Sequence, residues 1–327
     1  MSVRRRPALA LLACCAALGG GLLLAPAASA AVSCAYVDGG LPILPQGNVL
    51  EVTLSDDFDV AAIKRSGDEI VVRDYGRARD VACSGGTATV ATTDSIIVSG
   101  GGGLNEAGVH IDLGGGPLAP GATAEPDGSS EIEIAVDLPG SSDFAYIDGS
   151  GARDEIRFGT SAGAMAANLN SGAEPPGAAD ADLTIAHADF TGAFGRGGND
   201  LLTAAGGPGF DGALSRGGAA VVLFGAGGND RLVGHGGDDL AHGGPGNDSL
   251  DGGAGSDFLF GERGRDEIAA GRGADLIGSR DGTRDRVNCG RGNDNAFADR
   301  QDRLASCQRA PGNLGTPRIL FPGAPGG

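Results

Sequence analysis

Six nine-residue repeats follow one another without a gap between residues 225 and 278, and this period constrains the fold more than any other feature of the chain. In order, the repeats read GAGGNDRLV, GHGGDDLAH, GGPGNDSLD, GGAGSDFLF, GERGRDEIA and AGRGADLIG. Position 4 is always glycine, position 6 is always aspartate, and position 8 is Leu, Ile or Ala. A strict period of this length indicates a solenoid in which each repeat stacks on its neighbours. The last three residues of each repeat are long enough for a short strand whose position 8 faces inward.

The aspartates at position 6 indicate a cation-binding site. They are Asp230, Asp239, Asp248, Asp257, Asp266 and Asp275. Glycines at fixed positions allow turns that leave main-chain carbonyl oxygens bare, and the carboxylates add further hard oxygen ligands. Calcium takes about six to eight such oxygens, whereas magnesium demands tighter octahedral geometry and keeps its water. A metal-free solenoid whose aspartates cap turns is the alternative. Stacked carboxylates would repel one another, however, unless a cation lay between them.

Repeats such as GGPGNDSLD and GGAGSDFLF resemble the RTX, or haemolysin-type, calcium-binding nonapeptide repeats. The resemblance implies an all-β fold: a parallel β-roll, or β-solenoid, with two repeats per coil and Ca²⁺ bound between the turns of neighbouring coils. On this basis Asp230, Asp248 and Asp266 would line one edge of the roll. Asp239, Asp257 and Asp275 would line the other. Three stacked turns enclose two gaps, so two edges would hold about four calcium ions in this block.

Looser copies of the repeat flank this block. Residues 195–203 and 206–214 place Asp200 and Asp211 at position 6, and both are expected to bind calcium. In the following nine residues Ala220 stands where the aspartate is expected, so no site is predicted there. Asp285 and Asp294 continue the pattern after a further slip of the period.

The β-rich residues 31–193 leave two alternatives open. Short runs that alternate apolar and polar residues, such as EIEIAV at 131–136, are bounded by Gly, Pro and Asp and predict strands. The isolated match GSGARDEIR at 149–157 suggests a degenerate version of the same solenoid. A separate β-sandwich is the other interpretation.

The first thirty residues have the pattern of an export signal. Arginines at positions 4–6 precede an apolar stretch over residues 8–24, and Ala28-Ser29-Ala30 forms a cleavage site. The mature chain is therefore predicted to start at Ala31 and to be extracellular, a retained membrane anchor being the alternative. No later stretch is apolar enough to predict a transmembrane segment. The predicted organisation is a signal peptide (1–30), a β-rich region (31–193), a calcium-binding β-roll with a C-terminal disulfide cap (194–310) and a disordered Pro/Gly-rich tail (311–327).

Four cysteines remain after signal removal, and an even number in an exported protein predicts disulfides. They are Cys34, Cys83, Cys289 and Cys307. Of the three possible connectivities, Cys34–Cys83 and Cys289–Cys307 keep each bridge within its own region and are favoured. A metal site would call for a C-x-x-C spacing or a nearby histidine, and the sequence has neither.

Charge and motifs favour a non-enzymatic calcium-binding protein. With 24 Lys and Arg against 42 Asp and Glu, the formal net charge of −18 disfavours nucleic acid as a partner and favours calcium ions. Gly159-Thr160-Ser161-Ala162-Gly163 matches the nucleophile elbow of α/β-hydrolases, but chance produces this pattern readily in so glycine-rich a chain. An exported hydrolase, with residues 31–193 catalytic and the β-roll as a folding or secretion module, is the alternative function. A cell-surface or matrix partner is possible on either interpretation, and the sequence does not identify one.

Overall fold

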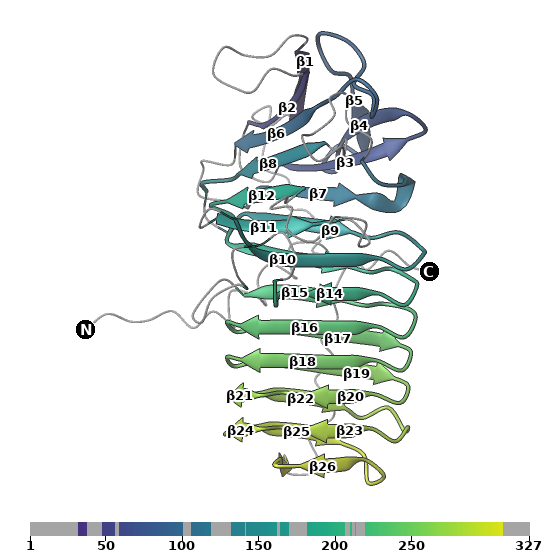
Figure 1. Ribbon diagram of the computed structural model, residues 1–327, viewed down its shortest axis with the longest axis vertical. Coiled ribbons are helices and arrows are strands. Elements are labelled where there is room, and N and C mark those ends of the chain that lie inside the picture. The colour runs from purple at the N-terminus through teal and green to yellow at the C-terminus, as the bar shows by residue number, and fades with distance from the viewer. Residues whose placement is uncertain are drawn as a thin grey trace, which may run out of the picture.

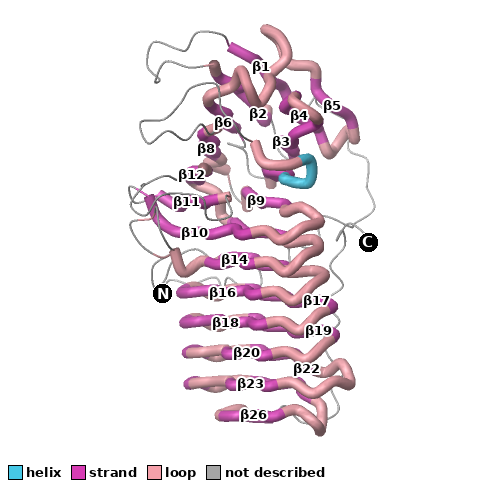
Figure 2. Tube along the Cα trace, turned by 45° about the vertical axis from the view of Figure 1, so that its right-hand side comes forward, coloured by secondary structure: helices cyan, strands magenta, loops and turns pink. Residues whose placement is uncertain are grey.

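The computed structural model describes residues 32–37, 48–55, 59–100, 106–118, 132–140, 142–161, 164–169, 182–206, 210, 213 and 220–309. The predicted signal peptide, the predicted tail at 311–327 and Asp211 lie outside the described residues. The described chain is almost entirely β-structure and winds into a tall stack of coils (Figures 1 and 2). The helix in this part of the chain is the short 3-10 helix η1 (Leu113–Gly115), which the Asp112 side chain caps by accepting from the Gly114 N–H. None of the described residues forms a helix long and apolar enough to cross a bilayer.

Two sheets form the stack, here called sheet A and sheet B. The 15 strands of sheet A are β1 (Val32–Val37), β2 (Val49–Leu54), β6 (Ser95–Gly100), β8 (Glu133–Asp137), β10 (Glu155–Ser161), β11 (Ala164–Asn168), β12 (Leu183–Ala186), β14 (Leu201–Thr203), β16 (Arg231–Gly236), β18 (Ser249–Ala254), β20 (Glu267–Ala269), β21 (Arg272–Gly273), β23 (Arg286–Asn288), β24 (Arg291–Gly292) and β26 (Arg303–Ala305). The 12 strands of sheet B are β3 (Val60–Ser66), β4 (Glu69–Asp74), β5 (Arg79–Val81), β7 (Gly108–Asp112), β9 (Phe144–Asp148), β13 (Phe190–Phe194), β15 (Val221–Phe224), β17 (Leu240–Pro245), β19 (Phe258–Arg263), β22 (Leu276–Ser279), β25 (Asn295–Ala298) and β27 (Gln308–Arg309).

The repeat block contributes its strands alternately to the two sheets, so two repeats complete one coil. In sheet A, Leu232 pairs with Leu250 and Leu250 with Ile268, all in parallel register. In sheet B, Ala241 pairs with Leu259, and Leu259 with Ile277. Each step of this register spans 18 residues, which is two repeats. The parallel β-roll implied by the resemblance to RTX repeats is confirmed.

The side chains at position 8 fill the space between the sheets. Leu232, Leu250, Leu259, Ile268 and Ile277 are at most 1% exposed and belong to one continuous apolar core. This core is built mainly from Ala, Val, Leu and Ile, because the coil leaves room for little more than one such side chain per strand at each level. The scarcity of aromatic residues, 4% of the chain, therefore does not prevent a closed core.

Residues 32–193 extend the same stack instead of forming a separate sandwich. Strand β8 pairs in parallel with β6 and β12, and β9 pairs in parallel with β7 and β13. Strand β13 then pairs with β15, so sheet B runs without a break from this region into the repeat region. The β-sandwich interpretation is wrong, and the degenerate solenoid is confirmed. Antiparallel additions depart from the simple coil: β1 on β2, the β3–β4–β5 meander, and β10–β11–β12 within sheet A.

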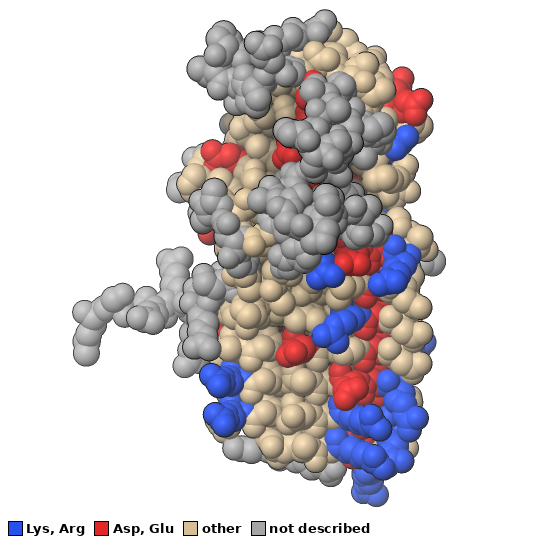
Figure 3. Space-filling view, in the orientation of Figure 1, with Lys and Arg blue, Asp and Glu red and all other residues tan. Residues whose placement is uncertain are grey.

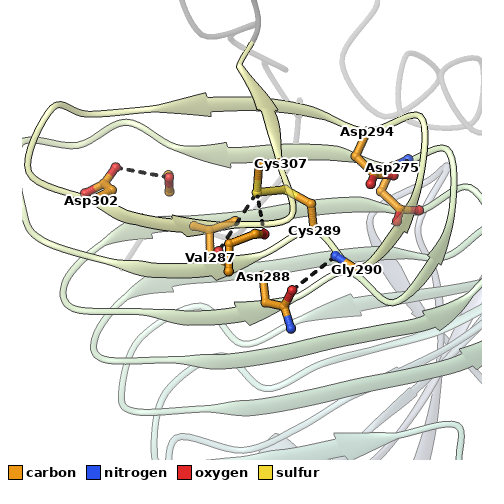
Figure 4. The surroundings of a disulfide bond; sticks show 10 residues. Asp275, Val287, Asn288, Cys289, Gly290, Asp294, Asp302 and Cys307 are labelled. Atoms are coloured by element: carbon orange, nitrogen blue, oxygen red, sulfur yellow. Dashed lines mark hydrogen bonds between the residues drawn. A yellow bond between two sulfur atoms is a disulfide. The ribbon is translucent and has the colours of Figure 1, made fainter.

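Two disulfides close the stack near its ends. Cys34 bonds Cys83 and Cys289 bonds Cys307, the connectivity that the sequence favoured. The second bridge links the chain just after β23 to the chain just after β26, so it joins the last coils of sheet A (Figure 4). An open end of a solenoid needs such a cap because its core would otherwise face water.

Removing the C-terminal bridge should loosen the end of the roll. The cysteines lie 18 residues apart, and cross-linking a loop of that length is worth about 3 kcal/mol by the chain-entropy relation. The double variant Cys289→Ala/Cys307→Ala should lose about that much unfolding free energy in urea. It should also need more calcium to fold. Cys34→Ala/Cys83→Ala is the matched control: it should lose stability without a shift in the calcium midpoint. Equal calcium midpoints for both double variants would contradict a role for the C-terminal bridge in supporting the adjacent coils.

Candidate functional site

Aspartates from successive coils form two rows, one along each edge of the roll. In the first row the Asp230 N–H donates to Asp248 Oδ1 at 2.8 Å, and the Asp248 N–H donates to Asp266 Oδ1 at 2.9 Å. In the second row the Asp239 N–H donates to Asp257 Oδ1 at 2.9 Å, and the Asp257 N–H donates to Asp275 Oδ1 at 3.0 Å. These are the two sets of three that the resemblance to RTX repeats assigned to opposite edges. Acidic side chains run along one edge of the lower stack between arginine side chains (Figure 3).

The rows extend beyond the strict repeats. The same N–H to Oδ1 bond joins Asp154 to Asp200, Asp200 to Asp230, Asp266 to Asp285, Asp285 to Asp302, and Asp275 to Asp294. Asp200, Asp285 and Asp294 therefore take the positions that the loosened period indicated. Asp154, which the sequence offered only as an isolated match, is the first member of the first row. Asp302 was missed, because it follows Asp285 by 17 residues instead of 18 and lacks the surrounding glycines.

The second carboxylate oxygen of most of these aspartates is buried without a donor. Oδ2 has no hydrogen-bond partner in Asp200, Asp230, Asp248, Asp257, Asp266, Asp275 and Asp285. These seven residues are at most 2% exposed. A buried carboxylate oxygen that accepts nothing is costly, because water no longer solvates it. Repetition of the same orphaned atom through the coils indicates an electrophile that every coil shares, either a proton or a metal cation.

A carbonyl oxygen of the next coil faces the same point as the orphaned oxygen in four of these residues, Asp200, Asp230, Asp248 and Asp257. A Cβ on Gly225 would lie 2.3 Å from Asp230 Oδ2 and 2.8 Å from the Gly243 carbonyl oxygen. A Cβ on Gly252 would lie 2.5 Å from Asp257 Oδ2 and 2.7 Å from the Ala270 carbonyl oxygen. Because glycine at the first position of the repeat has no side chain, a space remains between the coils. This space, here called the cradle, is lined by oxygen atoms of both coils.

The donor set of these cradles fits calcium. Among the described residues, no three His, Cys, Asp or Glu side chains gather closely enough to hold a metal by themselves. A cation between the coils would therefore be bound by carboxylates together with main-chain carbonyls, and such an all-oxygen set suits calcium and not zinc. His242 does not enter the rows: its Nε2 lies 3.4 Å from a Glu262 carboxylate oxygen on sheet B.

Burial raises the pKa values of the aspartates. Desolvation is the largest cause, and it raises the pKa of Asp257 to about 8 and that of Asp248 to about 7. The main-chain N–H that bonds each Oδ1 lowers the pKa, and the neighbouring aspartates of the same row raise it. Desolvation likewise outweighs the main-chain hydrogen bond and raises the pKa of Asp200 and Asp285 to about 7, and of Asp239, Asp266 and Asp275 to about 6. Without a cation, the folded roll therefore retains protons that the unfolded chain releases.

This difference predicts a pH dependence for the calcium-free protein. A carboxyl group with a pKa raised from 3.8 to between about 6 and about 8 stabilises the folded state fully below its unfolded value, and that contribution is lost as the pH rises through the folded values. In chelator, the roll should therefore be more stable at about pH 5 than at about pH 8. Calcium must displace these protons, so its affinity should rise over the same interval. Thermal denaturation at a series of pH values, with and without calcium, measures both slopes. If the melting temperature changed with pH by the same amount with and without calcium, competition between protons and calcium would be contradicted.

The remaining candidate residues have different surroundings. Asp211 lies outside the described residues, so its assignment stays a prediction. Ser161 ends β10 and pairs with Ala164 of β11 in an antiparallel hairpin. A nucleophile elbow instead requires a turn from a strand into a helix. Gly159, Thr160 and Ser161 of the G-x-S-x-G match lie instead within a strand that pairs with the next strand along the chain.

Comparison with known families agrees with the repeat assignment. Residues 217–241 and 242–277 match the family model of the RTX calcium-binding nonapeptide repeat, in four copies. The match covers the repeat block and not the whole chain. No curated protein and no solved structure compared with the chain matches it. The block that forms the regular coils thus consists of RTX nonapeptide repeats, a repeat type that binds Ca²⁺.

Proposed function

We propose that this chain is an exported, non-enzymatic protein that binds Ca²⁺ between the coils of its roll and folds on binding. The observation that carries the proposal is the set of seven buried Oδ2 atoms without a donor, four of which are shown above to share a cradle with a carbonyl oxygen of the next coil. The proposed ligands are Asp230, Asp239, Asp248, Asp257, Asp266 and Asp275, together with Asp200. Within the six-repeat block, two gaps on each edge give four calcium ions, and the flanking members of the rows offer further gaps.

The proposed mechanism couples binding to folding. Without calcium, the rows place like charges beside one another and bury them, and the core between the sheets is thin. A cation in each gap would remove this cost, and its binding free energy would add to the stability of the folded state. Extracellular calcium modules bind with Kd values of about 10⁻⁴ to 10⁻³ M, and we expect that range here. The roll would then remain unfolded where calcium is scarce, before export, and fold outside the cell.

Two observations support a role without catalysis. The repeat type that matches residues 217–277 is a calcium-binding one. Gly159, Thr160 and Ser161 of the G-x-S-x-G match lie in strand β10, which pairs antiparallel with β11, whereas a nucleophile elbow needs a turn from a strand into a helix. Calcium ions are the proposed partners, and export rests on the signal pattern over residues 1–30.

Equilibrium dialysis of the mature chain, residues 31–327, tests the binding directly. We expect four or more calcium ions per chain, in line with one ion per gap and carboxylate-rich coordination. Magnesium should bind far more weakly at equal concentration. A single bound calcium ion, or equal uptake of magnesium, would overturn the proposal.

A further inference from the structure

A groove runs across the last coils, along the edge that carries the second row of aspartates. It has a volume of about 450 Å³, and its polar lining consists of His235, Arg272, Asn288 and Arg291. The groove, here called the arginine groove, reaches from β16 across β18 and β21 to β24, which are hydrogen-bonded neighbours in this order. Three strand spacings give it a length of about 14 Å. It is therefore longer than a single small ion requires.

The rest of the lining is nearly bare of side chains. It consists of Gly253, Gly271 and Gly290 with one alanine. Gly271 has φ of +101°, and a Cβ there would lie 2.1 Å from the Gly253 carbonyl oxygen, so the stacking of the turns admits no side chain at this point. The floor of the groove therefore leaves the backbone open to a ligand.

Two arginines lie side by side in the groove without an acidic partner. The parallel pairing of β21 with β24 places Arg272 directly opposite Arg291, one strand spacing of about 4.8 Å away. Both residues are exposed, and neither guanidinium group forms a hydrogen bond or ion pair with any described residue. Like charges directly opposite each other destabilise a sheet. A ligand that carries negative charge would remove this cost.

The aspartates of the second row do not serve as that partner. Asp275 follows Arg272 by three residues, and Asp294 follows Arg291 by three. These two aspartates are only 1% and 2% exposed, and neither forms an ion pair with the groove arginines. The arginines therefore point their charge outward from the turns, away from the buried carboxylates.

The surface around the groove is positive although the chain is acidic. Residues 261–309 contain ten Arg and nine Asp or Glu, in a chain of net charge −18. Five of those nine carboxylates are buried in the two rows: Asp266, Asp275, Asp285, Asp294 and Asp302. Basic side chains accordingly gather at the edge of the lower stack where β21 and β24 lie (Figure 3). Such a surface attracts anions to the end of a molecule that otherwise repels them.

We propose that the arginine groove binds sulfate or phosphate groups carried along an extended polymer. A tetrahedral oxyanion of this kind offers three acceptor oxygens, so two guanidinium groups can bind it from both sides at once. A planar carboxylate fills only one such fork. The length of the groove and its bare floor suit a chain that continues past the arginines towards His235. Asn288, whose Oδ1 accepts from the Gly290 N–H, retains its amide N–H groups for the same ligand.

Fluorescence anisotropy of labelled dextran sulfate tests the binding, with the mature chain (residues 31–327) in saturating calcium at constant ionic strength. The polymer should bind, and sodium sulfate should displace it at much higher concentration. Neutral dextran and carboxymethyl dextran of matched charge density should bind not at all and several-fold more weakly, respectively. No binding of dextran sulfate, or equal binding of carboxymethyl dextran, would overturn the proposal. Circular dichroism shows separately whether calcium folds the roll, so a failure of the proposed function is distinguishable.

Two pairs of substitutions separate the groove from general charge. Arg272→Gln/Arg291→Gln should weaken binding of dextran sulfate about tenfold or more, because each side chain loses charged hydrogen bonds to the ligand. Arg286→Gln/Arg303→Gln is the matched control. These arginines are also exposed and directly opposite each other on adjacent strands, but they lie outside the groove. The control removes the same charge from the same coils and should weaken binding less than about twofold. Equal losses for the two pairs would overturn the proposal.

Discussion

Asp248→Asn should weaken calcium binding and leave the calcium-free protein as stable as the wild type, or more stable. Asp248 faces a gap on each side: its Oδ1 accepts from the Asp230 N–H, and its own N–H donates to Asp266 Oδ1. Asparagine keeps an oxygen for the first bond and the N–H for the second. It replaces only the buried Oδ2 and its charge, which have no partner among the described residues.

The two effects have opposite signs because they arise from the same charge. Without calcium, that charge is buried beside the other carboxylates of the row, so its removal relieves desolvation and repulsion. With calcium, the same charge supplies a ligand to two of the four gaps. The calcium midpoint should rise by about tenfold or more, since even groups that only orient a metal ligand are worth that much. The number of bound ions should fall by about two.

Asp251→Asn is the matched control for this variant. Asp251 lies in the same repeat, three residues further on, and its side chain is exposed on β18. The control removes the same charge from the same coil and should leave stoichiometry and midpoint unchanged. Calcium titration followed by calorimetry distinguishes the variants. If Asp248→Asn bound as many ions as the wild type with the same melting temperature, the aspartates would be turn caps and not ligands.

Gly264→Ala should have one of the largest effects on stability of any single methyl group. Gly264 occupies the fourth position of its repeat with φ of +137°, and a Cβ there would lie 1.4 Å from the Gly246 carbonyl oxygen of the preceding coil. No side-chain rotation relieves this contact, because the backbone fixes the position of the Cβ and the other atom is a backbone oxygen. The coils must separate, which breaks the register that holds the rows on both sides. A loss of about 4 kcal/mol or more is expected, in the range reserved for severe packing defects.

Two other glycines separate the steric contribution to this loss of stability from the contribution of backbone strain. Gly282 has φ of +93° but open space around a Cβ, so Gly282→Ala should cost only the conformational strain, about 1–2 kcal/mol. Gly151 has open space and no positive φ, so Gly151→Ala should change stability by about 0.5 kcal/mol or less. Urea denaturation in saturating calcium measures all three. Similar losses for Gly264→Ala and Gly282→Ala would show that the close stacking of coils is not what the fourth glycine serves.

The sequence predicts the regular part of the roll because one period fixes three properties at once. Position 4 sets the turn, position 6 sets the row and position 8 sets the core, so the pairing of Leu232 with Leu250 and of Asp230 with Asp248 follows from counting by 18. The same count fails where residues are inserted. The hairpin of β10 and β11 interrupts the stack, and the shortened spacing before Asp302 hides the end of the first row.

The strands of sheet B carry a signal that counting by nine does not use. Position 8 repeats in every unit, whereas positions 7 and 9 are apolar mainly in alternate units, as in Leu240 and Phe258. A comparison of residues 18 apart reveals that these positions are mostly apolar in sheet B and mostly polar in sheet A. In residues 32–193 the core pattern survives without the regular nine-residue spacing of aspartate and glycine, so strands are predictable there and their stacking order is not.

Calcium titration of the mature chain, residues 31–327, followed by circular dichroism with magnesium as the control, tests the central claim most directly. The account predicts a cooperative gain of β-structure as calcium approaches about 10⁻⁴ to 10⁻³ M, and no comparable gain with magnesium. A spectrum that already shows full β-structure in chelator and does not change with calcium would contradict it. The rows of aspartates would then be protonated turn caps on a roll that folds without metal.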